Sequence, residues 1–211
     1  MVRLEMGRKE KVLLSNHLVL NANSSHIPLA DSSVDMTFTS PPFKDDDISE
    51  DYFSAYSSWM SEIFRVTKKV AIVFNSSTKL KFVLDHWPAD RVMVWSKGFS
   101  LMSFRWSPIF VYGIPPYKVG KYIWCDAFGI QSIKNKWKVH QYQDPLFLYQ
   151  TIIKMFKDCK TVLDPFVGSG TTGQACKLLK LDFIGFDILQ EHSLLSKDRI
   201  SKVQVPMLWI K

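Results

Sequence analysis

Apolar residues occur along this chain in short runs, separated by longer stretches in which they recur with helical spacing. Seven short runs predict β-strands, at residues 17–21, 35–39, 69–75, 91–96, 105–113, 161–164 and 183–187. Helices are predicted at residues 51–67, 77–86, 145–157, 172–179 and 190–203. This alternation indicates an α/β fold with a mainly parallel sheet, while the short link between the strands at 91 and 105 predicts one antiparallel pair.

The size and composition of the chain limit the possible classes of protein. With 211 residues, no internal repeat and no clear linker, we expect a single domain over residues 1–211. Three cysteines without a CxxC pair and five histidines without HExxH spacing predict neither a disulfide framework nor a metal site. The first residues contain no apolar run typical of a signal peptide or membrane span, so we expect a cytoplasmic protein.

A glycine-rich segment, Asp164 to Gly173 (DPFVGSGTTG), lies between a predicted strand and a predicted helix. Glycines at such a turn allow a ligand to approach the backbone closely. Gly168 and Gly173 have the spacing of a phosphate-binding loop, but Gln174 and Ala175 stand where that loop has Lys and Ser or Thr, which disfavours ATP or GTP hydrolysis. By itself the segment is compatible with either an ordinary tight turn or a cofactor loop.

The next predicted strand ends in an acidic residue, Asp187, one helix after the glycine-rich turn. A carboxylate in this position can accept hydrogen bonds from ribose hydroxyls, which makes Asp187 a candidate nucleotide ligand. Asp is also a favoured N-cap residue, so Asp187 could instead cap the helix that begins near Leu189.

Together with the segment Thr39-Ser40-Pro41-Pro42-Phe43 far upstream, these residues resemble the DNA amino-methyltransferases that use S-adenosylmethionine. The resemblance covers nearly the whole chain and implies a seven-stranded Rossmann-like methyltransferase sheet. In this family, a catalytic segment that precedes the cofactor loop defines the β group, whose sheet is circularly permuted in chain order. The Ser-Pro-Pro-Phe form is typical of enzymes that methylate cytosine N4, often as part of restriction–modification.

The chemistry of an exocyclic amine explains these residue types, because its lone pair is delocalised into the ring and must be held for attack. Ser40 Oγ and the Pro41 carbonyl can each accept an N–H bond from the amine. Pro41 and Pro42 keep the backbone extended and stiff, and Phe43 offers a flat face for a base removed from its stack. Taken alone, the segment could equally be a proline-rich turn with Phe43 in the core.

The resemblance also implies which residues surround the cofactor and where the chain departs from the family. The expected cofactor-binding residues are Asp164, Phe166, Gly168, Gly170, Thr171, Asp187 and Asn21. Asn21 stands where an acidic residue commonly approaches the adenine of the cofactor. An amide can still hydrogen-bond an adenine edge, so we expect altered cofactor affinity rather than inactivity.

Residues 114–144 are the candidate target-recognition segment, which is short for an enzyme that reads a DNA sequence. Aromatic residues are interleaved there with candidate DNA-binding lysines: Lys118, Lys121, Lys134, Lys136 and Lys138. A net charge of +7 and an isoelectric point near 9.2 also favour a polyanionic partner. The alternative for this segment is a solvated loop whose aromatic residues cover the sheet edge.

The sequence thus predicts a site-specific DNA methyltransferase acting on cytosine N4. Two alternatives stay open: the same catalyst acting on adenine N6 or on RNA, and a non-catalytic nucleic-acid-binding module with a methyltransferase fold. DNA is the expected partner. The resemblance makes a homodimer plausible, and the short recognition segment raises the possibility of a separate recognition partner.

Overall fold

The computed structural model describes residues 17–42, 49–97, 106–113, 126–129 and 143–205. Its elements are β1 (His17–Asn21), β2 (Val34–Thr39), α1 (Glu50–Val66), β3 (Thr67–Phe74), the 3₁₀ turn η1 (Ser77–Lys79), α2 (Leu80–His86), β4 (Arg91–Ser96), β5 (Trp106–Tyr112), β6 (Ala127–Phe128), α3 (Leu146–Lys154), β7 (Thr161–Asp164), α4 (Thr171–Leu179), β8 (Asp182–Asp187) and α5 (Gln190–Ser201). Among the described residues, no helix is long and apolar enough to cross a membrane.

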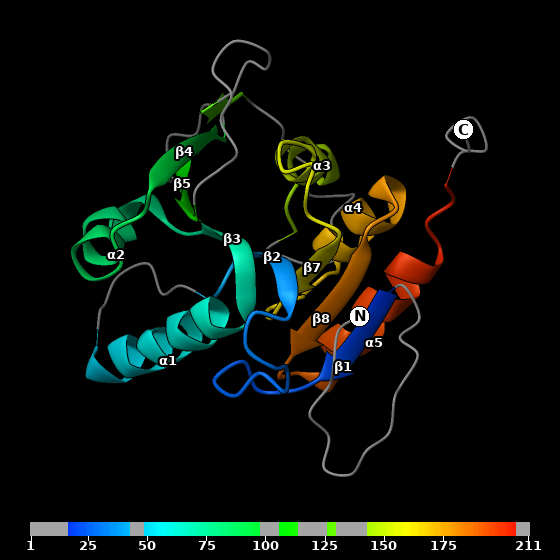
Figure 1. The fold of residues 1–211 in the computed structure, drawn as a ribbon, viewed down its shortest axis with the longest axis horizontal. Coiled ribbons are helices and arrows are strands. Elements are labelled where there is room, and N and C mark those ends of the chain that lie inside the picture. The colour runs from blue at the N-terminus through cyan, green and yellow to red at the C-terminus, as the bar shows by residue number, and fades with distance from the viewer. Residues whose placement is uncertain (1–16, 43–48, 98–105, 114–125, 130–142, 206–211) are drawn as a thin grey trace.

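All strands belong to one sheet with the order β1-β8-β7-β2-β3-β5-β4-β6 (Figure 1). Every neighbouring pair is parallel except those of β5, which runs antiparallel to both β3 and β4. The predicted α/β class with a mainly parallel sheet is therefore confirmed, as is the antiparallel pair formed by the strands at 91 and 105, β4 and β5. The sequence did not predict that β5 would also pair antiparallel with β3. The sequence did not predict the eighth strand, β6, which has two residues and pairs with β4.

The centre of the sheet joins two segments that lie far apart in the chain. Strand β2 pairs in parallel with β7, with Met36 opposite Val162 and Thr37 opposite Leu163. The strands β1, β8, β7, β2 and β3 all end at one edge of the sheet, and the antiparallel β5 begins at this edge. The chain segments that follow the parallel strands therefore meet along this edge, where ligands bind in open α/β sheets.

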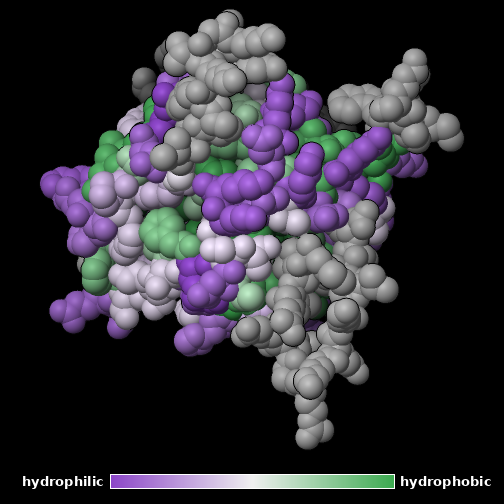
Figure 2. Space-filling view, in the orientation of Figure 1, coloured by the Kyte–Doolittle hydropathy of each residue, from purple (hydrophilic) through white to green (hydrophobic). Residues whose placement is uncertain are grey.

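Helices cover both faces of the sheet and complete two hydrophobic layers. Alternate residues of β3 point to opposite faces: Ile72 packs with residues of α3 and α4, whereas Val73 packs with residues of α1 and α2. Helix α5 adds Ile200 to the first layer, beside α4. In the orientation of Figure 1, the described surface is mostly polar, with smaller apolar areas between the polar groups (Figure 2).

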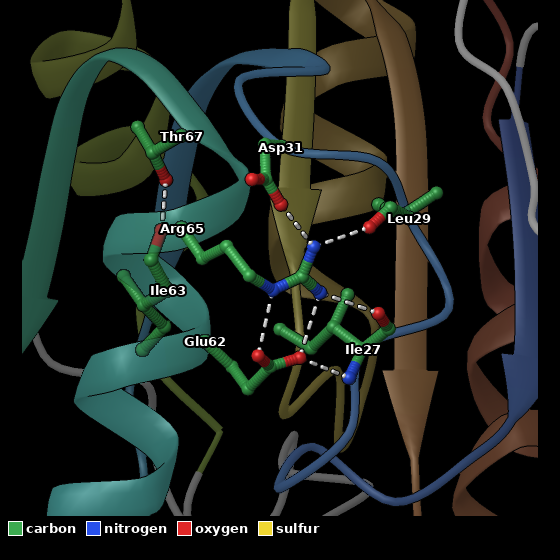
Figure 3. Close-up of polar contacts among 7 residues, drawn as sticks. All are labelled: Ile27, Leu29, Asp31, Glu62, Ile63, Arg65 and Thr67. Atoms are coloured by element: carbon green, nitrogen blue, oxygen red, sulfur yellow. Dashed lines mark hydrogen bonds and ion pairs between the residues drawn. The ribbon is translucent and has the colours of Figure 1, made fainter.

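The last turn of α1 is bound to the segment between β1 and β2 through Arg65 (Figure 3). The guanidinium group of Arg65 donates two hydrogen bonds to the Glu62 carboxylate, at 2.7 and 2.8 Å, and one to Asp31 at 2.8 Å. It also donates to the carbonyl groups of Ile27 and Leu29, both at 2.8 Å. Because the planar guanidinium has five donors in a fixed arrangement, it can hold this segment in a single position.

Candidate active site

A cavity of about 890 Å³ runs along the edge at which the parallel strands end. Its walls come from the ends of β2, β3, β7 and β8, from the N-terminal parts of α3 and α4, and from β4 and β5. Asp187 and Asp164 lie at the ends of neighbouring strands β8 and β7, and Ser40 follows the adjacent strand β2. The structure therefore places the two segments singled out in the sequence against one cavity.

Strand β2 leads directly into the segment predicted to be catalytic. Ser40, Pro41 and Pro42 line the cavity. Tyr52 in the first turn of α1 directs its hydroxyl to the Pro42 carbonyl oxygen at 3.4 Å. Ser49 caps this helix by accepting a hydrogen bond from the backbone N–H of Tyr52, which fixes the return of the chain after the catalytic segment. Phe43, the last residue of the predicted pocket, lies outside the described residues.

The carboxylate of Asp164 connects β2 to the glycine-rich loop. It is almost fully buried and accepts hydrogen bonds from Thr39 Oγ1 at 2.7 Å, Thr172 Oγ1 at 2.5 Å and the backbone N–H of Phe166 at 3.1 Å. Burial raises the pKa of Asp164 to about 6, although these three hydrogen bonds favour the charged form and oppose the increase. Asp164 is thus a hydrogen-bonding centre between the two halves of the site.

The glycine-rich loop adopts a backbone that requires glycine at two positions. Gly168 and Gly170 have φ angles of +45° and +80°. Gly168 lines the cavity, as do Phe166 and Thr171, which were also predicted to bind cofactor. Gly170 is not among the cavity-lining residues; a Cβ there would lie 2.8 Å from the Cβ of Ser196, so this glycine permits close packing of the loop on α5.

Asp187 lies at the end of β8 with its carboxylate in the cavity wall. One carboxylate oxygen accepts the backbone N–H of Gly168 at 2.9 Å, and the other accepts that of Leu189 at 3.0 Å. The second bond closes a turn between β8 and α5. The N-cap residue of α5 is Leu189, so Asp187 is not the helix cap that the sequence left open as an alternative. His192, which the sequence analysis did not select, also lines the cavity, with Nδ1 3.3 Å from the Asp187 carboxylate.

Asn21 lies beside Asp187, another residue predicted to bind cofactor, but it is not among the residues that line the cavity. Its side-chain amide donates hydrogen bonds to the carbonyl groups of Asp187 and Ile188, both at 2.9 Å. It therefore fixes the backbone at the end of β8. The residues that line the cavity after β1 are instead Asn23, Ser24 and Ser25, and Ser24 donates a hydrogen bond to the Pro165 carbonyl.

Sequence reasoning missed a second group of cavity residues on the far side of Ser40. Asn75 follows β3, Trp95 and Lys97 lie at the end of β4, and Ser107 lies at the start of β5. None belongs to a recognisable motif. These residues share only their place at the edge of the sheet that borders the cavity. That place depends on the order and direction of the strands, which the sequence alone does not give.

Most of residues 114–144, the segment predicted to contact DNA, lies outside the residues that the structure describes. The five lysines of residues 114–144, at positions 118, 121, 134, 136 and 138, all lie outside the described residues. Of that segment, residues 126–129 and 143–144 are described, and Gln143 and Asp144 line the cavity. The DNA-binding role of these lysines therefore remains a prediction.

Comparison with solved structures supports the fold. The cytosine-N4-specific PvuII DNA methyltransferase is 17% identical, with a TM-score of 0.68, and the match covers 90% of this chain and 91% of that chain. The M1.HpyAVI–SAM complex is 20% identical, with a TM-score of 0.66, and the match covers 87% of this chain and 98% of that chain. At these identities the similarity concerns the fold alone.

Comparison with sequences supports the family. The type II methyltransferase M2.LlaDCHI of Lactococcus lactis subsp. cremoris is 39% identical over 83 residues, which are 39% of this chain and 30% of that protein. The chain thus matches less than a third of the length of this relative. Residues 75–198, more than half of the chain, match the sequence model of the N6/N4 DNA methylases. The chain belongs to the N6/N4 DNA methylase family.

Proposed function

We propose that this protein is an S-adenosylmethionine-dependent DNA methyltransferase that transfers a methyl group to the exocyclic N4 of cytosine. One observation carries the proposal: the Ser40-Pro41-Pro42 segment and the loop that follows Asp164 line the same cavity, and Thr39 and Asp164 are joined by a hydrogen bond of 2.7 Å. A methyl transfer needs the acceptor amine and the methyl donor side by side, and this arrangement provides a place for each.

The residues on the β7–β8 side fit the proposed cofactor. Oδ1 of Asp187 accepts the N–H of Leu189 and also faces His192 Nδ1, whereas Oδ2 accepts the N–H of Gly168 and keeps a further lone pair that a ribose hydroxyl can use. Gly168 leaves the loop backbone open to close approach, and the exposed side chain of Ile188 beside Asp187 offers an apolar surface to an aromatic ring. The cavity volume of about 890 Å³ is near the upper end of the usual range for ligand sites.

The protein's own contribution to the reaction is to hold and orient the amine. When bound, the cofactor supplies an electrophilic methyl group. Ser40 Oγ and the Pro41 carbonyl oxygen each accept a hydrogen bond from one N–H group of the amine. This orientation turns the lone pair of the amine towards the cofactor side of the cavity. Because Pro41 and Pro42 have fixed φ angles, these two acceptors are held in place before the base arrives.

We further propose that the enzyme belongs to the β group. The catalytic segment precedes the cofactor loop in the chain, although β2 and β7 are neighbours in the sheet. The Ser-Pro-Pro form supports cytosine as the target base. Recognition of a DNA sequence would involve residues 114–144, a second copy of the chain or a separate partner.

The direct test is to incubate the protein with labelled S-adenosylmethionine and unmethylated duplex DNA, then digest the DNA and identify the modified nucleoside by mass. N4-methylcytosine is the expected product. Ser40→Ala should lower the yield, whereas Ser58→Ala, a change at a half-buried position on α1 outside the cavity lining, should not. N6-methyladenine as the product would show that adenine is the target base. A parallel reaction with RNA, if it alone gave product, would show that RNA is the substrate. DNA binding without any product would favour the non-catalytic alternative.

A further inference from the structure

The cavity extends well beyond the residues assigned to the amine and the cofactor. From Ser40 it continues past the end of β3 to β5 and β4, where it is lined by Phe74, Asn75, Ser107 and Trp95. Neighbouring strands lie about 4.8 Å apart, so β5 is roughly 10 Å from β2 along the edge of the sheet. This distance is comparable with a pyrimidine ring together with one hydrogen bond of about 2.9 Å at each side.

The strand order determines on which side of Ser40 the base must lie. The proposed cofactor residues are on β7 and β8, on one side of β2, whereas Asn75, Ser107 and Trp95 are on β3, β5 and β4, on the other side. If the amine is held at Ser40 and the methyl donor approaches from β7, the ring of the base extends towards β5 and β4. The residues there face the ring atoms next to the amine.

Two of these residues carry hydrogen-bond donors without a protein partner in the described part of the chain. The indole Nε1 of Trp95 is buried and has no hydrogen-bond partner there. Ser107 lies directly opposite Trp95 in the β4–β5 pairing, is 4% exposed, and none of the described hydrogen bonds uses its hydroxyl. A buried donor left unpaired costs about 1–3 kcal/mol, so a ligand acceptor in this place would gain affinity.

Contacts with neighbouring side chains involve Trp95 and also Asn75, which lines the same part of the cavity. Lys97 places its ammonium group 4.9 Å from the centre of the Trp95 ring, at the exposed end of the subsite. The side chain of Asn75 is fixed by a hydrogen bond to the Tyr56 hydroxyl at 3.0 Å and by one from the backbone N–H of Ser76 at 2.8 Å. The wall that faces the base is therefore preorganised.

We infer that Trp95 and Ser107 determine base specificity by donating hydrogen bonds to the ring acceptors of the target base, an inference that rests on the proposed function. Cytosine carries two adjacent acceptors next to its amine, N3 and O2. Adenine carries N1, followed by a C–H group that accepts nothing. Two neighbouring donors therefore match cytosine and would leave one donor unpaired against adenine.

The test uses Trp95→Phe and Ser107→Ala, with Trp87→Phe as a matched control in the aromatic cluster of α1 and α2, outside the cavity lining. The DNA is a duplex with the sequence that the wild-type protein methylates. We expect each of the two variants to lower kcat/KM for DNA about tenfold, as one lost hydrogen bond predicts, while the Kd for S-adenosylmethionine stays within about twofold. The control should change neither constant.

A second substrate separates base reading from a purely structural role. In a duplex with 3-deazacytosine at the target position, the acceptor at ring position 3 is missing. The wild-type protein should lose activity on this duplex about tenfold, whereas the variant that has lost the matching donor should lose little more, because the two changes remove the same hydrogen bond.

Each outcome of these measurements decides the inference. It is overturned if both variants keep the wild-type kcat/KM, if each loses activity on 3-deazacytosine as strongly as the wild-type protein does, or if the wild-type product is N6-methyladenine. If the wild-type protein methylates no base, the proposed function itself fails. Normal methylation of cytosine by both variants would reject only the inference about Trp95 and Ser107.

Discussion

Replacing Asp164 with Asn should change how the stability of the protein depends on pH. The buried carboxyl group has a pKa of about 6 in the folded protein, against 3.8 in an exposed chain. Between these two values the folded state holds a proton that the unfolded state has lost. The wild-type protein should therefore become less stable as the pH rises from about 4 to 6, and this loss should persist at higher pH.

The size of the effect follows from the difference of about two units between the pKa of Asp164 in the folded protein and in an exposed chain. At 1.36 kcal/mol per unit, the charged form of Asp164 costs about 3 kcal/mol of folding free energy at neutral pH. Asn cannot ionise and therefore avoids this cost. The change also weakens the hydrogen bonds with Thr39 and Thr172, but that loss lowers the stability of the variant by a nearly constant amount and produces little slope with pH.

The measurement is the free energy of unfolding in urea for both proteins at several pH values between 4 and 7.5. The variant's free energy minus the wild-type value should rise by about 2.4 kcal/mol across this range, because part of the full effect lies below pH 4. Asp35→Asn is the control, with a pKa shift of the opposite sign. Burial alone would raise the pKa of Asp35, but the backbone N–H of Lys160 and the ammonium group of Lys69 lower it below the 3.8 of an exposed chain. The stability that this carboxylate contributes is therefore lost only as the pH falls below about 4, and the difference between Asp35→Asn and wild type should stay nearly constant from pH 4 to 7.5. If the free energies of unfolding of wild type and Asp164→Asn change with pH in the same way, the reasoning is refuted.

Three further predictions concern other parts of the structure. Arg65→Ala leaves two buried carbonyl groups and Glu62 without their donor, and should lower the free energy of unfolding by about 2–4 kcal/mol in urea titrations. Gly173→Ala places a methyl group 2.3 Å from a side-chain carbon of Ile200, and calorimetry should show a lower Tm, corresponding to about 1–3 kcal/mol. Ser40→Ala should lower kcat while largely sparing the Kd for S-adenosylmethionine, and Asp187→Ala should do the reverse; equal loss of cofactor affinity in both variants would contradict this division.

Local sequence signals predicted most of the fold but only part of the site. Strands β1, β4 and β7 have the predicted bounds, because each is a short apolar run between clear breaks. The two-residue strand β6 has too few positions to show any periodicity, and its pairing with β4 is set by tertiary structure.

The two motif segments identified their side of the cavity because their residue types are distinctive. Trp95 and Ser107 gave no such signal, since their contribution depends on the strands beside them and on the register of β4 with β5. Asn21 shows the converse: its position at the end of β1 was foreseen, but the direction of its side chain depends on the carbonyl groups of Asp187 and Ile188, where the neighbouring β8 ends.

The parallel pairing of β2 with β7 also has a consequence for synthesis of the chain. Strand β2 emerges before α1, α2 and α3, whereas its neighbour β7 and the strand β8, which carries Asp187, emerge only after these helices. Until then one edge of β2 lacks its partner, and Thr39 lacks the carboxylate it bonds to. A nascent chain that lacks β7 and β8 has no complete site, so it should become able to bind cofactor only after β8 has been made.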